Sequence, residues 1–331
     1  MDRPVRSLHP FPDGWYVLEL ASDLKKEQLI EKTWMGREII VWRDRAGAVC
    51  VADAFCPHLG SHLGPSVGGM VRDGNLVCPF HGFEYAVDGK CVAAPGAPPP
   101  RSARLKLYEV AEVNGFIFAY WDNAGRPAEW QIPDVCPEGW EGRVLRRLRL
   151  RAHPQTTTEN SVDLCHLAHV HGYRDLKQLA PAEIEGPFLS SSYEFRKGIL
   201  TAGLQNLEIW TAIDVGVWGL GISTVEVHGY EPSIEVRLWI MATPVDGDHI
   251  DYSLAVDPKG ASNWLRLLPA FIRQRVVPKV LLNDLVLEVG RDAEIWSRQL
   301  YQPKPVLSRA DGDLFRFRRY CEQFYGEAQT G

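Results

Sequence analysis

The chain has 331 residues and a formal net charge of −6, and 45% of its residues are hydrophobic. This length and apolar content are sufficient for two hydrophobic cores of ordinary size. The negative charge balance gives no electrostatic reason to expect a nucleic-acid partner. The start of the chain has no apolar signal core and no run approaches 18 apolar residues, so we expect neither a signal peptide nor a membrane-spanning helix.

Short β-rich runs separated by turn residues predict a small all-β domain in the first part of the chain. The runs cover residues 15–18, 38–42, 48–52, 105–110 and 116–121. A proline-rich loop at 95–100 precedes the last two runs. Prolines then interrupt regular structure around residue 130. We therefore expect two domains, 1–130 and 131–331.

Two cysteine/histidine pairs lie in the first domain, Cys56 with His58 and Cys78 with His81. Two thiolates and two imidazoles suit one Rieske [2Fe–2S] cluster, in which the cysteines hold one iron and the histidines the other. Neutral imidazoles raise the reduction potential above that of an all-cysteine ferredoxin, so such a cluster accepts electrons from one. A tetrahedral zinc site is the alternative, but zinc sites usually pair C-x2–4-C with H-x3–5-H.

The remaining cysteines show no spacing typical of a disulfide framework. They are Cys50, Cys91, Cys136, Cys165 and Cys321. Free thiols and an iron–sulfur cluster are both typical of a reducing compartment, so we expect a cytoplasmic protein.

Strands followed by helices predict an α+β second domain. Residues 147–151 and 233–242 alternate between polar and apolar side chains, as antiparallel strands do. Residues 263–275 and 278–302 have helical patterns. Large apolar side chains between these segments are candidates to line a pocket: Leu204, Trp210, Trp218, Leu220 and Ile222.

A second metal pattern, Asp163-x2-His166-x4-His171, lies in this domain. Two neutral imidazoles and one carboxylate form the facial triad that binds Fe(II) and leaves positions open for O2. On an ideal helix His166 shares a face with His169 rather than His171, so the spacing alone leaves His169 open.

The third ligand of this triad requires a distant carboxylate. Asp284, Glu288 and Asp292 share one face of the predicted helix at 278–302, and Glu294 lies close by. Only one of these acids is needed, and the spacing does not choose between them.

The motifs resemble those of Rieske non-heme iron oxygenases. The loops CPHLG and CPFHG are similar to the two cluster loops of Rieske proteins, and Ser61 and Phe80 stand where respiratory Rieske proteins have extra cysteines. Phe83 stands where many relatives have tryptophan. The Asp163–His171 motif and the segment RDAEIW resemble the mononuclear-iron motifs, and residues 311–325 look like the end of 3-ketosteroid 9α-hydroxylase oxygenases and cholesterol 7-desaturases.

The resemblance implies a role for each site residue. His166, His171 and Asp292 would bind the mononuclear iron, with His169 as a pocket histidine. Asp163 would relay electrons and protons between the cluster of one chain and the iron of its neighbour in a homotrimer, although a helix N-terminal acid favoured by the dipole is the alternative. Asn160 is expected beside the site. The implied fold is a small all-β Rieske domain followed by an α+β, helix-grip-like catalytic domain.

The implied function is that of a terminal oxygenase that uses O2 and electrons from a ferredoxin or flavin reductase, with NAD(P)H acting only through that reductase. A hydrophobic, steroid-like molecule would be hydroxylated. Desaturation of a sterol, and oxygenation or demethylation of an aromatic compound, are the alternatives. An alternative from another class of protein is a Rieske electron carrier fused to a hydrophobic-ligand-binding domain, which would bind no mononuclear iron.

Overall fold

The computed structural model describes residues 8–136, 143–198, 208–229, 234–260, 269, 272, 276–308 and 311–326. The chain divides into two compact units, residues 15–139 with 245–247, and residues 1–14, 140–244 and 248–331. Most of the helix expected at 263–275 lies outside the described residues. Among the described helices, none is long and apolar enough to cross a membrane.

The smaller unit consists of three antiparallel sheets. Its strands are β1 (Gly14–Leu20), β2 (Leu29–Trp34), β3 (Arg37–Arg43), β4 (Val49–Asp53), β5 (Met70–Arg72), β6 (Asn75–Val77), β7 (Glu84–Tyr85), β8 (Cys91–Ala93), β9 (Leu107–Tyr108), β10 (Val110–Val113) and β11 (Phe116–Trp121), and a 3-10 turn, η1, spans Pro65–Val67. The strand orders are β1-β11-β10, β2-β3-β4-β9 and β5-β6-β7-β8. The single run predicted at 105–110 is therefore divided between β9 and β10.

The core of this unit holds the cysteine/histidine loops in place. Strand β11 is the central strand of its sheet and its six residues are all buried, which explains its continuous apolar sequence. Trp42 on β3 and Tyr85 on β7 lie in one apolar cluster together with Cys56 and Cys78. Both thiols therefore lie at the edge of a packed core and not on a mobile surface loop.

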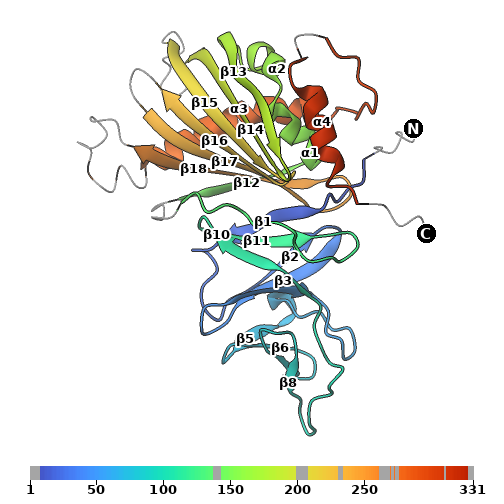
Figure 1. The fold of residues 1–331 in the computed structure, drawn as a ribbon. Coiled ribbons are helices and arrows are strands. Elements are labelled where there is room, and N and C mark those ends of the chain that lie inside the picture. The colour runs from blue at the N-terminus through green and yellow to red at the C-terminus, as the bar shows by residue number, and fades with distance from the viewer. Residues whose placement is uncertain are drawn as a thin grey trace. The chain divides into compact units, whose positions relative to one another are not determined.

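The larger unit is built on one seven-stranded antiparallel sheet with the order β12-β18-β17-β16-β15-β14-β13 (Figure 1). Its strands are β12 (Leu145–Leu150), β13 (Arg174–Glu185), β14 (Phe188–Gly198), β15 (Glu208–Trp218), β16 (Ile222–Gly229), β17 (Ile234–Pro244) and β18 (Ile250–Gly260). Its helices are α1 (Pro154–Thr158), α2 (Leu164–His169), α3 (Val277–Trp296) and α4 (Leu314–Glu322), with a 3-10 turn, η2, at Glu159–Ser161. The expected α+β fold is confirmed.

Helix α3 runs across one face of this sheet (Figure 1). Its buried residues recur every three to four positions, as an amphipathic helix requires, and Leu282 and Val289 pack against the apolar side chains of β17 and β18. At its end the Trp296 and Tyr252 rings meet edge to face with centroids 5.4 Å apart. The helix ends at Trp296, six residues before the predicted end, and the chain continues towards Pro303, which cannot extend a helix.

Helix α4 covers another part of the same sheet. Phe317 and Tyr320 pack with apolar residues of β14 and β15, and the Tyr320 hydroxyl donates to the Pro187 carbonyl over 2.8 Å. Alternate residues of β15, such as Ile213 and Val215, are buried beneath these helices. The sheet therefore has an apolar face beneath the helices, and a cavity lies between this face and α3.

Candidate metal centres and substrate cavity

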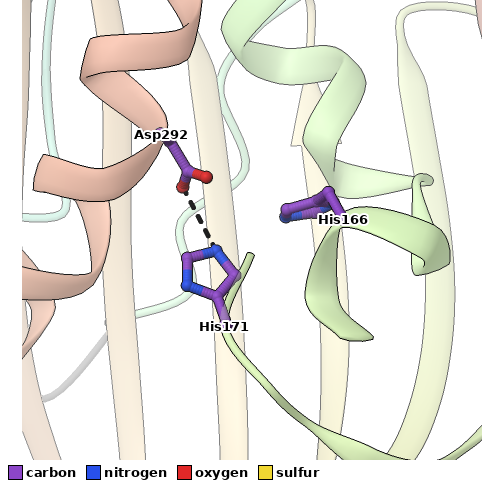
Figure 2. A group of neighbouring side chains, drawn as sticks. All are labelled: His166, His171 and Asp292. Carbon is purple, nitrogen blue, oxygen red and sulfur yellow. Dashed lines mark ion pairs between the residues drawn. The ribbon is translucent and has the colours of Figure 1, made fainter. Parts of the chain in front are cut away.

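The structure brings His166, His171 and Asp292 together in the larger unit (Figure 2). One ligand atom of each side chain lies within 4.8 Å of the others. The His171 Nε2 atom is 3.3 Å from Asp292 Oδ2, and the two imidazole centroids are 5.4 Å apart. In the described part of the chain His171 Nδ1 is buried without a hydrogen-bond partner. This arrangement fits the facial triad that binds Fe(II).

The local backbone explains why His171 and not His169 faces the triad. Helix α2 ends at His169, whose side chain is exposed, and Gly172 then turns the chain in the left-handed region with φ of +72°. His171 therefore lies beyond the helix, and the ideal-helix spacing that favoured His169 does not apply to it. Asp292 is buried on α3, whereas Glu294 is exposed on the other side of that helix.

Asp163 caps helix α2. Its carboxylate Oδ1 accepts from the backbone N–H groups of Cys165 and His166 at 2.9 and 3.2 Å, which satisfies donors at the helix N-terminus. The Asp163 carbonyl oxygen lies 2.5 Å from His166 Nδ1. Donation from Nδ1–H to that carbonyl leaves Nε2 free to bind a metal.

Electrostatics favour the neutral form of His166. Burial holds the pKa of His166 below its usual value, against the opposing influence of the Asp163 and Asp292 carboxylates. Only the neutral imidazole carries the lone pair that a metal needs. His166 is therefore available as a ligand at neutral pH.

The two cysteine/histidine pairs occupy matching loops in the smaller unit. Gly60 N–H donates to the Cys56 carbonyl over 2.9 Å, and Gly82 N–H donates to the Cys78 carbonyl over 3.0 Å. Both glycines have positive φ, +73° and +66°, which an L side chain rarely adopts. Each loop therefore turns back tightly after its cysteine.

The donors in these loops fit a Rieske cluster. The Cys56 and Cys78 thiols are each only 2% exposed, and the His58 and His81 ring centroids are 4.9 Å apart. Burial raises the pKa of the Cys56 thiol, and the neighbouring Cys78 raises it further. Two buried thiols and two paired imidazoles are the ligand set of a [2Fe–2S] Rieske centre and not of a C-x2–4-C zinc site.

Two neighbouring side chains support the cluster loops. The Tyr85 hydroxyl lies 3.0 Å from the Cys56 sulfur. The Phe83 ring stacks on His58 with a centroid distance of 4.4 Å. Phe83, the aromatic residue after the second loop, therefore orients the His58 ring.

A cavity extends from the metal triad between α3 and the apolar face of the sheet. The exposed surface of its walls is mostly apolar, and it includes Val215 and Ile213 on β15, Val225 on β16 and Ile240 on β17. Asn160 also lines this cavity. The cavity is therefore suited to holding an apolar molecule beside the triad.

Comparison with known proteins identifies the family. Residues 119–325 match the family described as 3-ketosteroid 9α-hydroxylase C-terminal domain, and residues 14–112 match the Rieske [2Fe–2S] domain. The chain belongs to the 3-ketosteroid 9α-hydroxylase family of Rieske oxygenases. The expected resemblance is thereby confirmed, and the chain is a Rieske non-heme iron oxygenase.

Relatives and solved structures agree with this assignment. Cholesterol 7-desaturase of Ciona intestinalis is 29% identical over 96% of this chain and 69% of its own length. The oxygenase component of 3-ketosteroid-9-alpha-monooxygenase of Rhodococcus rhodochrous is 26% identical over 97% of this chain and 87% of its own. Dicamba monooxygenase bound to dicamba has a TM-score of 0.67 at 19% identity, covering 94% of this chain and 96% of its own, which shows a common fold.

The cavity of this oxygenase is not lined by the side chains that the sequence suggested. Trp218, Leu220 and Ile222 are buried in the core outside the cavity, and Trp210 is partly exposed. Leu204 lies outside the described residues. The expectation was wrong for the tryptophans because they alternate with the cavity-lining residues of β15 and so project from the other face of the sheet.

Sequence reasoning also missed a polar group in the wall of the oxygenase cavity. The Tyr173 hydroxyl donates to Glu288 Oε2 over 2.5 Å, and Lys197 Nζ lies 3.9 Å from Glu288 Oε1. Burial and Glu288 raise the pKa of Tyr173 well above its usual value, so the phenol stays protonated. Glu288 therefore interacts with these two side chains and is not part of the metal triad. The i, i+4 spacing of Glu288 and Asp292 was the one sequence signal that could have placed Glu288 in the cavity wall beside the triad.

Proposed function

We propose that this oxygenase uses O2 and externally supplied electrons to hydroxylate a hydrophobic, steroid-like substrate. The observation that carries the proposal is the His166, His171 and Asp292 triad at the wall of a mostly apolar cavity. The family match at residues 119–325 and the 3-ketosteroid relative support a steroid as the substrate.

The cluster and the iron divide the chemistry between them. Cys56, His58, Cys78 and His81 would hold the [2Fe–2S] cluster, which supplies one electron at a time. His166, His171 and Asp292 would hold Fe(II), which supplies the site for O2 activation. The protein's own part is to place one C–H bond beside the triad and to exclude water with the apolar walls.

Asp163 would connect the two centres across subunits of a homotrimer. Its carboxylate Oδ2 lies 3.8 Å from His166 Nδ1, and a quarter of the side chain remains exposed. The carboxylate is thus accessible to a cluster histidine of a neighbouring chain, and it would couple electron transfer to the position of a proton. Capping α2 and relaying electrons are compatible roles, because capping uses only Oδ1.

A ferredoxin or flavin reductase would supply the electrons, with NAD(P)H as the ultimate donor. All seven cysteines are free thiols, which together with an iron–sulfur cluster supports a reducing, cytoplasmic location.

Desaturation is the second candidate reaction. The cholesterol 7-desaturase relative matches 96% of the chain, and hydroxylation and desaturation begin with removal of hydrogen from the same kind of C–H bond. The described site residues serve either outcome equally well.

Product mass tests the proposal. The reduced protein is exposed to O2 with a panel of 3-keto steroids, sterols and small aromatic compounds. We expect a steroid product that has gained one oxygen, whereas loss of two hydrogens would establish the desaturase. Turnover of aromatic compounds alone would refute a steroid substrate.

A further inference from the structure

The cavity beside the metal triad continues into a second chamber along α3. Each chamber has a volume of about 150 Å³, and they share six lining residues: Lys197, Thr211, Val227, Leu238, Leu285 and Glu288. Helix α3 lines the first chamber as far as Trp296 and the second as far back as Leu281. At 1.5 Å per residue, the joined cavity extends for about 20 Å along the helix. An elongated molecule therefore fits it better than a single small ring.

A buried hydroxyl group lies where the two chambers meet. Thr211 is 1% exposed, and within the described ranges its Oγ1 has no hydrogen-bond partner. A buried polar group without a partner is destabilising, so such groups are few in folded proteins. Because Thr211 lines both chambers, a bound molecule is in position to supply the missing partner.

Lys197 lies on the same face of the sheet as Thr211. The pairs Phe195↔Thr211 and Lys197↔Ile209 make Lys197 and Thr211 diagonal neighbours on strands β14 and β15. The Lys197 ammonium has three donors, and its distance of 3.9 Å from Glu288 Oε1 exceeds a hydrogen-bond length. It can therefore donate to a further acceptor within the cavity.

The charges around this point select against an anionic ligand. The opposite charges of Lys197 and Glu288 offset one another, and Asp284 adds a second carboxyl group to the wall of the second chamber. A carboxylate ligand would face two acids, and a cationic group that binds Thr211 would lie beside the ammonium of Lys197, its diagonal neighbour. A neutral oxygen atom accepts from Lys197 and Thr211 without repulsion from either side.

We propose that Lys197 and Thr211 bind a neutral ketone or hydroxyl oxygen of the substrate at the junction of the two chambers, away from the oxidised C–H bond. Glu288, which lies beside Lys197, precedes Asp292 by one helical turn, or about 6 Å, so the oxygen is bound away from the metal triad. The inference rests on the proposed function and narrows its substrates to elongated apolar molecules that carry such an oxygen.

Paired ligands test this assignment. The dissociation constants of 5α-androstan-3-one and of the oxygen-free 5α-androstane are measured by tryptophan fluorescence. We expect Lys197→Met and Thr211→Val each to weaken ketone binding about tenfold and to leave hydrocarbon binding unchanged. Thr211→Ser keeps the hydroxyl group and should keep the ketone affinity.

Matched control substitutions lie on the other face of the same sheet. Lys177, whose ammonium lies 5.8 Å from the Trp210 ring centroid, and Thr224 line neither chamber. Lys177→Met and Thr224→Val should therefore leave both affinities unchanged.

Three results would overturn the assignment. Unchanged ketone affinity in Lys197→Met and Thr211→Val would exclude recognition by these residues, and an equal loss for ketone and hydrocarbon would indicate packing alone. Tighter binding of the carboxylate dicamba than of the ketone, lost in Lys197→Met, would make the second chamber a carboxylate site. If the wild-type protein binds neither steroid, the proposed function itself fails. Lys197 is partly exposed, so its variant remains informative even if Thr211→Val does not fold.

Discussion

Substituting Asp163 separates the two roles of this side chain, because asparagine caps a helix as well as aspartate does but carries no charge. In Asp163→Ala both hydrogen bonds to the N-terminus of α2 are lost. Loss of an N-cap of this kind costs about 1 kcal/mol of unfolding free energy, or about 2 °C in Tm for a chain of this size. The free energy of unfolding of Asp163→Asn should lie within a few tenths of a kcal/mol of the wild-type value.

The turnover rate should depend on the negative charge at position 163 and not on the capping of α2. If Asp163 relays electrons between subunits, both variants lose most of their steady-state turnover, although only the alanine variant loses stability. The assay combines thermal unfolding with the rate at which the reduced cluster is re-oxidised when O2 and substrate are added. Cys165→Ser, at an exposed position on the same helix, is the control. Full turnover in Asp163→Asn would refute the relay, and equal destabilisation of both variants would refute the capping argument.

Two further predictions concern the cluster and a buried acid. Tyr85→Phe removes the hydroxyl 3.0 Å from Cys56 Sγ, so the cluster midpoint potential should fall by roughly 20–60 mV in a voltammetric titration. Tyr108→Phe is the control, because the Tyr108 hydroxyl donates to a carboxylate elsewhere in the unit. An unchanged potential in Tyr85→Phe would exclude the hydrogen bond to Cys56. Burial raises the pKa of Glu159, although Arg318 Nε lies 2.8 Å away. Because the folded-state pKa is raised, the protonated acid contributes stability below its ordinary pKa, and this contribution is lost as the pH rises through the raised value. The unfolding free energy of Glu159→Gln should therefore rise relative to the wild type as the pH increases above about 4.5, and a relative fall would contradict the sign of the shift.

Local patterns in the sequence predict much of the fold. The run FIFAYW is apolar throughout because β11 is the central strand of its sheet, and it was predicted with the bounds that the structure gives. The helix at α3 was predicted from its acidic and apolar spacing, although its end was not, because Trp296 is the last side chain that packs on the sheet. The spacing of apolar residues and the secondary-structure propensities of the side chains predict which elements form more reliably than they predict where each element ends.

The metal site could be predicted only in part from the residues themselves. An ideal helix favoured His166 with His169, and only the resemblance pointed to His171, because spacing does not reveal that α2 ends before His171 and that Gly172 turns the chain. The roles of Lys197 and Thr211 could not be predicted at all. Alternation along a strand marks two faces, but the face that lines the cavity is decided by where α3 packs.

Counting the irons tests the central claim most directly, because the proposed oxygenase has a second metal centre that an electron carrier lacks. The measurement compares purified wild-type protein with Asp292→Ala, and with Glu294→Ala as a control on the exposed side of the same helix. We predict three irons per chain in the wild type and in Glu294→Ala, and two in Asp292→Ala, with the cluster's spectrum unchanged. Two irons in the wild type, or three in Asp292→Ala with undiminished steroid turnover, would contradict the account.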